Sequence, residues 1–280
     1  MSLVLLDSLS LPGDPAKPNE DAFAHSDHAA LVMDGATPLG DPLMPGPSDA
    51  QWLAQFGARR LMAHLKDGNS PRIAITHALK DAEKSFHALR RHPIREKWQT
   101  PCASLILATQ SKTGLDCFWF GDCSALLLHD GACSVIGEVF DKRGQEAQRA
   151  REIMQEGKHT PSVDFNRPKI NNLMRASRNR INSGSYWLFS PNPRAAHHVA
   201  HAKARVSPGD LLLLASDGLL ALATDYGVYD AIGLVNAARE KTLAGLGEQL
   251  RAIENADALG EKFARFKKSD DATALLLEIK

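Results

Sequence analysis

The segment SLILATQSKTGLDCFWFGDCSALLLHDGACSVI, residues 104–136, consists of short apolar runs separated by turn residues. The apolar runs are 104–109, 115–120, 125–128 and 133–136. The sequences between them are Lys112-Thr113-Gly114, Gly121-Asp122 and Asp130-Gly131. Runs of this length, bounded by glycine and aspartate, favour strands over helices. We therefore predict an antiparallel meander with tight hairpins over this segment.

Helical periodicity precedes the meander. Ser48, followed three residues later by Gln51, predicts a capping box at the start of one helix, and Ser70-Pro71 predicts the start of a second. Further predicted strands are 4–11, 22–33, 186–189, 203–206, 210–216 and 273–279. Further predicted helical segments are 143–155, 228–238 and 242–255, with irregular chain from 156 to 182. Helix pairs between blocks of antiparallel strands predict one α+β domain: a central antiparallel β-sandwich flanked by pairs of helices, in four α/β/β/α layers.

Bulk properties exclude several classes of protein. The formal net charge is +0, which gives no general attraction to nucleic acid or to membranes. Met1–Leu11 has neither the basic start nor the apolar length of a signal peptide, and no apolar run is long enough to span a bilayer. The four cysteines contain no Cys-x-x-Cys pair, so we expect reduced thiols in a cytoplasmic protein.

Carboxylates stand at the ends of apolar runs in four places. They are Glu20-Asp21, Asp34-Gly35, Asp217-Gly218 and Asp270-Asp271. Like charges about 4 Å apart repel by roughly 4 kcal/mol at intermediate dielectric, so such groups beside buried strands indicate a bound cation. Carboxylate oxygens are hard ligands that favour Mg²⁺ or Mn²⁺ over zinc. The sequence therefore predicts a metal-dependent hydrolase.

In their order along the chain these residues resemble the PPM-type (type 2C) metal-dependent protein serine/threonine phosphatases. The matching residues are Glu20-Asp21, Asp34-Gly35, Gly121-Asp122, Asp217-Gly218 and Asp270-Asp271-Ala272-Thr273. A lone Asp-Gly also marks ordinary turns, but five matches in order form a strong joint signal. The resemblance covers essentially all 280 residues. The segment from Asn182 to Pro193 further resembles a bacterial subgroup of the family.

The resemblance implies a site for two Mn²⁺ or Mg²⁺ ions. Asp34 would bridge both ions, and the backbone carbonyl of Gly35 would add an oxygen. Asp217 and Asp270 would complete one ion, with Asp271 as a hydrogen-bonding neighbour, although the order of Asp270 and Asp271 stays open. Asp34 and Asp217 are thus the candidate catalytic residues. The further candidate ligands are Glu20 and Asp21, for the second ion or its waters, and Asp122, either for a weaker third ion or as a hairpin turn residue.

The chain also departs from the family pattern. The place of the phosphate-binding arginine is Ala16, so Lys17 is the candidate substrate-binding residue, without the bidentate fork of arginine. Ala36-Thr37-Pro38 stands where many relatives have a histidine or a glycine run, so the leaving-group acid of the family is missing and a metal-bound water would have to serve. Cys123-Ser124 replaces the usual Ser-Arg. Ala221 replaces an aspartate, which weakens the case for a third ion.

The stretch from Phe165 to Gly209 contains no Asp or Glu and lies in a predicted basic flap-like insertion at about 141–200. Its cationic residues are Arg167, Lys169, Arg175, Arg178, Arg180, Arg194, Lys203 and Arg205. The stretch is either a surface that attracts phosphorylated substrates or an ordinary solvated basic face. We expect His197, His198 and His201 to face solvent rather than to bind zinc.

The predicted function is dephosphorylation of phosphoserine or phosphothreonine in proteins, with a phosphorylated protein as the partner. Two alternatives stay open. One is a catalytically weak or inactive pseudophosphatase that acts as a binding module, suggested by the missing arginine. The other is a hydrolase of small phosphate esters, whose metal chemistry would be the same.

Overall fold

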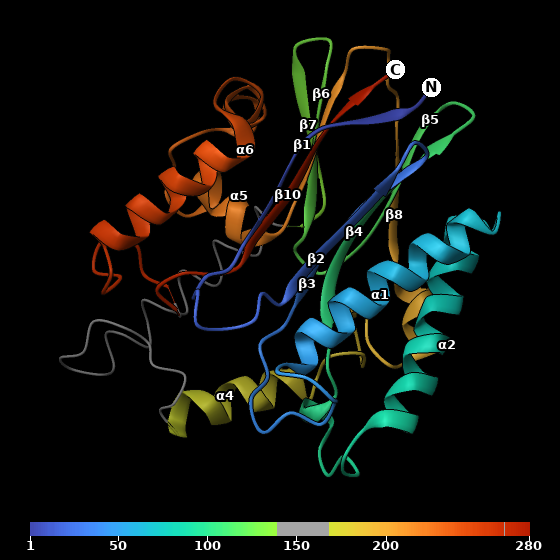
Figure 1. Ribbon diagram of the computed structural model, residues 1–280, viewed down its shortest axis with the longest axis vertical. Helices are drawn as coiled ribbons and strands as arrows, with labels where there is room; N and C mark the ends of the chain where they lie inside the picture. The colour runs from blue at the N-terminus through green and yellow to red at the C-terminus, as the bar shows by residue number, and fades with distance from the viewer. Residues whose placement is uncertain (139–167, 266) are drawn as a thin grey trace.

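The computed structural model describes residues 1–138, 168–265 and 267–280. Within these residues, two five-stranded antiparallel sheets lie face to face (Figure 1). The first sheet has the order β1 (Leu3–Leu11), β10 (Ala272–Ile279), β9 (Leu211–Ala215), β6 (Ser124–His129) and β7 (Ala132–Ile136). The second has the order β2 (Asp21–Ser26), β3 (Ala29–Gly35), β4 (Ala103–Ser111), β5 (Gly114–Phe120) and β8 (Ala200–Ala204).

Helices cover the outer face of each sheet. The helices α5 (Asp217–Thr224) and α6 (Ala231–Ala256) pack on the first sheet, and α1 (Asp49–Lys66) and α2 (Pro71–Leu89) on the second (Figure 1). A third apolar cluster, which includes Val32, Ile106 and Leu214, fills the space between the sheets. Three apolar layers separate four layers of structure, which confirms the predicted α/β/β/α sandwich. No helix in the described residues is long and apolar enough to cross a membrane.

The predicted meander over residues 104–136 is wrong in its pairing. β4 pairs with β5, and β6 pairs with β7, but the two hairpins belong to different sheets. Gly121-Asp122 is therefore a crossing between the sheets and not a hairpin turn, with Gly121 at φ 73°. The neighbour of β5 is β8 instead of β6. This crossing brings Asp122 to the edge where the two sheets meet.

Several element boundaries also differ from the predictions. Residues 22–33 form two strands that turn at Asp27-His28, and residues 186–189 contribute isolated bridges in place of a strand. The strand predicted at 203–206 is β8, at 200–204. A helix, α4 (Pro168–Arg178), occupies part of the predicted irregular stretch, and α5 was not predicted. The helix predicted at 143–155 lies outside the described residues, whereas the two predicted amphipathic segments join in α6 across a kink at Thr242.

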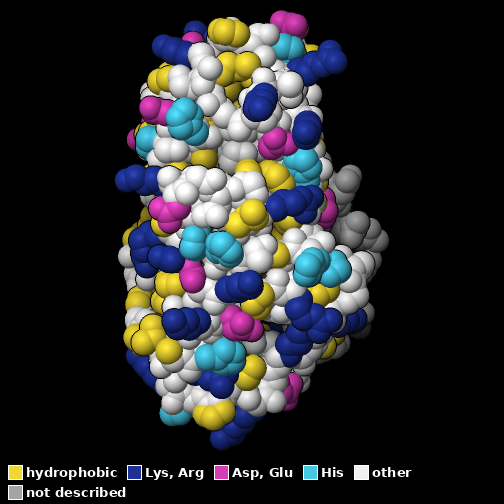
Figure 2. Space-filling view, turned by 90° about the vertical axis from the view of Figure 1, so that its right-hand side faces the viewer, with side chains coloured by type: hydrophobic (Ala, Val, Ile, Leu, Met, Phe, Trp, Pro, Cys, Tyr) yellow, Lys and Arg dark blue, Asp and Glu magenta, His cyan; other side chains and the backbone are white. Residues whose placement is uncertain are grey.

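The outer face of α1 and α2 carries interspersed cationic, acidic and histidine side chains (Figure 2). Asp81 on α2 joins the two helices here. Its Oδ2 lies 2.7 Å from Nε of Arg60 and 2.7 Å from Nε2 of His64, both on α1. Although partial burial raises the pKa of Asp81, hydrogen bonds from His64 and Arg60 lower it overall. The folded state therefore binds this proton less tightly than the unfolded state does.

We expect Asp81→Asn to reduce the free energy of unfolding at pH 7 by roughly 0.5–1 kcal/mol, the scale of a partly exposed ion pair. Because the folded pKa is below the unfolded one, this contribution is present above the unfolded pKa and is lost as the pH falls through the folded pKa. Urea unfolding from pH 7 down to pH 3 should show the wild type and variant converging. Glu83→Gln on the same helix is the control, and a gap that stays constant with pH would contradict this assignment.

Candidate metal centre

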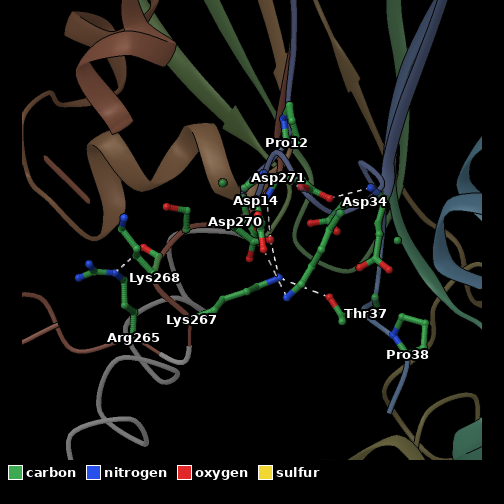
Figure 3. A pocket seen from close by; sticks show the side chains of 18 of the residues that line it. Pro12, Asp14, Asp34, Thr37, Pro38, Arg265, Lys267, Lys268, Asp270 and Asp271 are labelled. Carbon is green, nitrogen blue, oxygen red and sulfur yellow. Dashed lines mark hydrogen bonds and ion pairs between the residues drawn. The ribbon is translucent and has the colours of Figure 1, made fainter. Parts of the chain in front are cut away.

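Three carboxylates meet where the strand ends of both sheets come together. Asp34 lies at the end of β3, Asp122 in the crossing between β5 and β6, and Asp217 at the start of α5 directly after β9. One carboxylate oxygen from each lies within 4.8 Å of the other two. They face an open cleft of about 1640 Å³, which Asp270 and Asp271 also line (Figure 3). The structure thus brings two predicted ligands, Asp34 and Asp217, together with Asp122, whereas Asp270 lies outside this group of three. Their role as metal ligands stays a prediction.

Two further acidic side chains lie beside this cluster. Asp21 is the cross-strand partner of Asp34 in the β2–β3 register, and its side chain is buried. Its Oδ2 accepts a 2.8 Å hydrogen bond from the Ser216 hydroxyl, whereas its Oδ1 has no hydrogen-bond partner among the described residues. Glu20 accepts a short hydrogen bond from the Ser48 hydroxyl. Both carboxylates are therefore positioned by serines from other elements.

Ser48 and Ser104 hold the cluster in place in ways that the motifs did not reveal. Ser48 Oγ caps α1 by accepting from the backbone N–H groups of Ala50 and Gln51. The reciprocal half of the predicted capping box is wrong, since the Gln51 side chain donates to the Asn19 carbonyl instead. Ser104 on β4 donates to Oδ1 of Asp122 at 2.6 Å. Isolated serines carry no sequence signal of this kind, so only the fold identifies them.

The electrostatics of the cluster strongly disfavour negative charge without a counter-ion. Burial, and then the charges of neighbouring aspartates, raise the pKa of Asp34 well above its usual range. Burial and the charges of Asp271, Asp270 and Asp217 do the same for Asp21, against the hydrogen bond from Ser216. Burial also raises the pKa of Glu20, opposed by hydrogen bonds from Ser48 and Thr37. A bound cation would reverse this penalty.

Asp270 and Asp271 have separate contacts. Asp271 accepts from the backbone N–H of Gly13 at 2.7 Å and of Glu20 at 2.6 Å, which confirms its hydrogen-bonding role and fixes the loop before β2. Asp270 Oδ1 lies 2.5 Å from Nζ of Lys267, and its charge acts on Asp34. The half-buried Arg251 on α6 donates to the Asp270 carbonyl at 2.7 Å and pairs with the buried Glu254.

Both Asp-Gly motifs place glycine where a side chain would collide with the backbone. A Cβ on Gly35 would lie 2.6 Å from the Glu20 carbonyl oxygen and 2.7 Å from that of Ala50. A Cβ on Gly218 would lie 2.0 Å from the Asp271 carbonyl oxygen. Each glycine therefore permits the strand end that carries one carboxylate to approach the loop that carries another.

The predicted cationic and histidine residues have varied surroundings. Lys17 lies in the cleft wall, 3.7 Å from Asp14 and with 76% of its side chain exposed. Arg175 and Arg178 donate to the carbonyls of Leu39 and Thr37, so they tie α4 to the loop after Asp34-Gly35. His197 and His198 are exposed, as predicted, and His198 also stacks on Trp187. The solvent-facing prediction is wrong for His201, which is partly buried and pairs with Asp116 at 2.6 Å because β8 lies beside β5.

The residues present fit hard divalent cations. The cluster offers carboxylate oxygens alone, and cysteine does not contribute: Cys102, Cys117 and Cys123 are buried as free thiols. An oxygen-only set favours Mg²⁺ or Mn²⁺ over zinc. The Asp21 oxygen without a hydrogen-bond partner and the raised pKa values of the cluster point the same way.

Solved protein serine/threonine phosphatases share this architecture. The catalytic domain of the phosphatase PstP, crystallised with two manganese ions, is 17% identical, with a TM-score of 0.56 over 99% of both chains. The PPM phosphatase MsPP of Mycobacterium smegmatis, in complex with cacodylate, is 18% identical, with a TM-score of 0.56 over 99% of this chain and 100% of that one. The photosystem II phosphatase PBCP is 16% identical, with a TM-score of 0.58 over 99% of both chains.

No family model matches the sequence, and no curated protein matches it. The chain has the fold of the PPM-type (type 2C) phosphatases, so the resemblance drawn from its motifs is confirmed at the level of the fold. At these identities the likeness establishes architecture, and the chemistry has to be argued from the site itself.

Ser216 joins three strands at the centre, and its removal should weaken the site. Its hydroxyl donates to Asp21 and accepts from the Thr273 backbone N–H at 2.9 Å, in a fully buried position. We expect Ser216→Ala to cost about 1–3 kcal/mol of stability, because two buried groups lose their partner. It should also weaken Mn²⁺ binding, measured by calorimetry. Ser134→Ala on the exposed edge of β7 is the control, and equal effects of the two changes would refute this role.

Proposed function

We propose that this protein is a Mn²⁺- or Mg²⁺-dependent phosphatase that hydrolyses phosphoserine and phosphothreonine in proteins. The observation that carries the proposal is the meeting of Asp34, Asp122 and Asp217 at the strand ends of two sheets. The shared fold with serine/threonine phosphatases, one of which holds two manganese ions, supports the same reading. One phosphatase domain over 1–280, the basic insertion at about 141–200 and a cytoplasmic location stay predictions of the sequence.

In this proposal the cations would be held by Asp34, Asp217 and Asp270, with the backbone carbonyl of Gly35 adding an oxygen. Asp21 and Glu20 would act on a second ion or through its waters, and Asp122 would be the ligand of a weaker third ion. When bound, such cations activate water and stabilise the negative charge that develops on a phosphoryl group. The chain's own contribution is orientation: Ser216, Ser48 and Asp271 hold Asp21, Glu20 and the loop before β2 in fixed positions.

The test uses the purified chain stripped of metal with a chelator. Calorimetric titration with Mn²⁺ and with Mg²⁺ should show binding, and metal should switch on hydrolysis of p-nitrophenyl phosphate and of phosphoserine and phosphothreonine peptides. Metal binding without hydrolysis of any substrate would identify the pseudophosphatase alternative. Turnover confined to small esters would identify the small-ester hydrolase. The absence of metal binding would refute the proposal.

A further inference from the structure

Lys267 places an ammonium group at the mouth of the carboxylate cluster. Its Nζ lies 2.5 Å from Oδ1 of Asp270 and 3.5 Å from Oγ1 of Thr37. Asp270 precedes β10 of the first sheet and Thr37 follows β3 of the second, so the side chain reaches across the line where the sheets meet (Figure 3). With 40% of the side chain exposed, the ammonium is accessible from the cleft.

The arginines around the cleft have structural contacts. Arg251 pairs with Glu254 at 2.6 Å and donates to backbone carbonyls, and Arg265 does the same with Asp257 at 2.8 Å. Arg175 and Arg178 donate to the carbonyls of the loop after Asp34-Gly35. Lys267 differs from these described arginines, because its contacts are a candidate metal ligand and a hydroxyl.

A phosphate ester that enters this cleft meets a surplus of negative charge. The acidic groups around the site are Glu20, Asp21, Asp34, Asp122, Asp217, Asp270 and Asp271. Two divalent cations carry fewer positive charges than this set carries carboxylates. An ammonium beside the cluster would offset part of the remaining repulsion and donate a charge-assisted hydrogen bond to the anion. A cation held by Asp270 would repel the Lys267 ammonium and compete with it for the carboxylate charge, so metal loading would favour release of the ammonium into the cleft.

We propose that Lys267 binds the phosphate group of the substrate. The inference rests on the proposed function and assigns its phosphate-binding residue. It moves that role from Lys17, whose ion pair is with the exposed Asp14, to a lysine that contacts the cluster itself. The flexible lysine stem, with rotatable N–H donors, suits a group that exchanges Asp270 for a phosphate oxygen.

The experiment compares the wild type with Lys267→Met, Lys267→Arg and the adjacent Lys268→Met. Calorimetry measures binding of Mn²⁺ to the metal-free proteins and then of inorganic phosphate to the Mn²⁺-loaded proteins. Steady-state assays of p-nitrophenyl phosphate supply KM and kcat. We expect Lys267→Met to weaken phosphate binding by about 10- to 100-fold, the scale of one charged hydrogen bond, and to raise KM similarly. Its Mn²⁺ affinity should be unchanged or higher, Lys267→Arg should recover most phosphate binding, and Lys268→Met should resemble the wild type.

The outcomes distinguish this inference from the proposed function. If the Lys267→Met variant binds phosphate as tightly as the wild type does, the assignment is overturned, even if the variant binds Mn²⁺ more tightly, since Lys267 is then only a counter-ion for the carboxylates. If the wild type hydrolyses the substrate and Lys267→Met has the same KM and kcat, the role of Lys267 is refuted while the proposed function stands. A wild type that binds no Mn²⁺ refutes the proposed function and the inference together.

Discussion

Asp34→Asn is expected to abolish metal-dependent hydrolysis while making the metal-free protein more stable. Asp34 belongs to the cluster with Asp122 and Asp217 and lies directly across the β2–β3 register from Asp21. The neutral amide removes one of several charges that repel one another at this point. With roughly 4 kcal/mol for two like charges 4 Å apart at intermediate dielectric, a net gain of about 1–3 kcal/mol in the metal-free protein is expected.

The pH dependence follows from the same charges. Because burial and like charges raise the pKa of Asp34 in the folded state, that state binds the proton more tightly than the unfolded chain does. The resulting stability is fully present below the unfolded pKa, about 3.9 for aspartate, and is lost as the pH rises through the folded pKa. Thermal unfolding in chelator should therefore show wild-type stability falling from acid toward neutral pH, with a smaller fall in Asp34→Asn.

Mn²⁺ should reverse the order of stability. At a free Mn²⁺ concentration about 100 times the dissociation constant, binding adds about 2.7 kcal/mol per site to the free energy of unfolding of the wild type. The Asp34→Asn variant should gain far less stability from the same Mn²⁺ concentration. Turnover should fall by about 10³-fold or more, as expected when several kcal/mol of transition-state stabilisation are lost. Asp27→Asn, in the exposed turn of the same hairpin, is the control. If metal-free Asp34→Asn were less stable than the metal-free wild type, repulsion between the clustered carboxylates would not be what destabilises the metal-free protein.

The layers of the fold and the ends of its strands were readable from the sequence because each depends on local pattern. Helical periodicity in 49–89 and alternating short runs near 104–136 report which face of each element is buried. Carboxylates directly after such runs lie at strand ends, and the structure has Asp34 and Asp217 there. The expectation that they meet at one site came from the order of the motifs, which resembles that of a phosphatase family, and did not depend on which strands pair.

The pairing of strands, by contrast, depends on contacts that local pattern does not encode. Gly121-Asp122 has the composition of a hairpin turn, yet it passes between sheets because β8, about 80 residues later, takes the edge of β5. The turn at Asp27-His28 contains neither glycine nor proline, so one long strand was predicted where two exist. Such outcomes are decided by tertiary packing.

Residues that support the site from a distance were also out of reach. Lys267 lies in a stretch, Lys267-Lys268-Ser269, that has the composition of a solvated loop, and Ser104 and Ser216 are ordinary strand-end serines. Their roles arise because the fold brings them to Asp270, Asp122 and Asp21. A useful signal did exist for Lys267: it stands three residues before a candidate metal ligand.

Gly218→Ala is the other change with a large expected effect, because α5 lies very close to the segment that precedes β10. The added methyl group would lie 2.0 Å from the Asp271 carbonyl oxygen, a backbone atom that cannot rotate away. The start of α5 and the Asp270-Asp271 segment would have to separate. We expect a loss of roughly 2–4 kcal/mol in urea unfolding, at the upper end for overpacking, because the collision involves two main chains.

The same separation should disturb the metal centre, since Asp217 precedes Gly218 and Asp270 precedes Asp271. Calorimetry of Gly218→Ala should therefore show weaker Mn²⁺ binding even where the protein remains folded. Gly245→Ala is the matched control in a helix, because its methyl group would lie 3.7 Å from the nearest atom, Oγ1 of Thr242. That change should stabilise the protein by about 0.5–1 kcal/mol through helix propensity and leave Mn²⁺ affinity intact. If Gly218→Ala behaved like Gly245→Ala in both measurements, the contact between α5 and the segment before β10 would not set the geometry of the carboxylates.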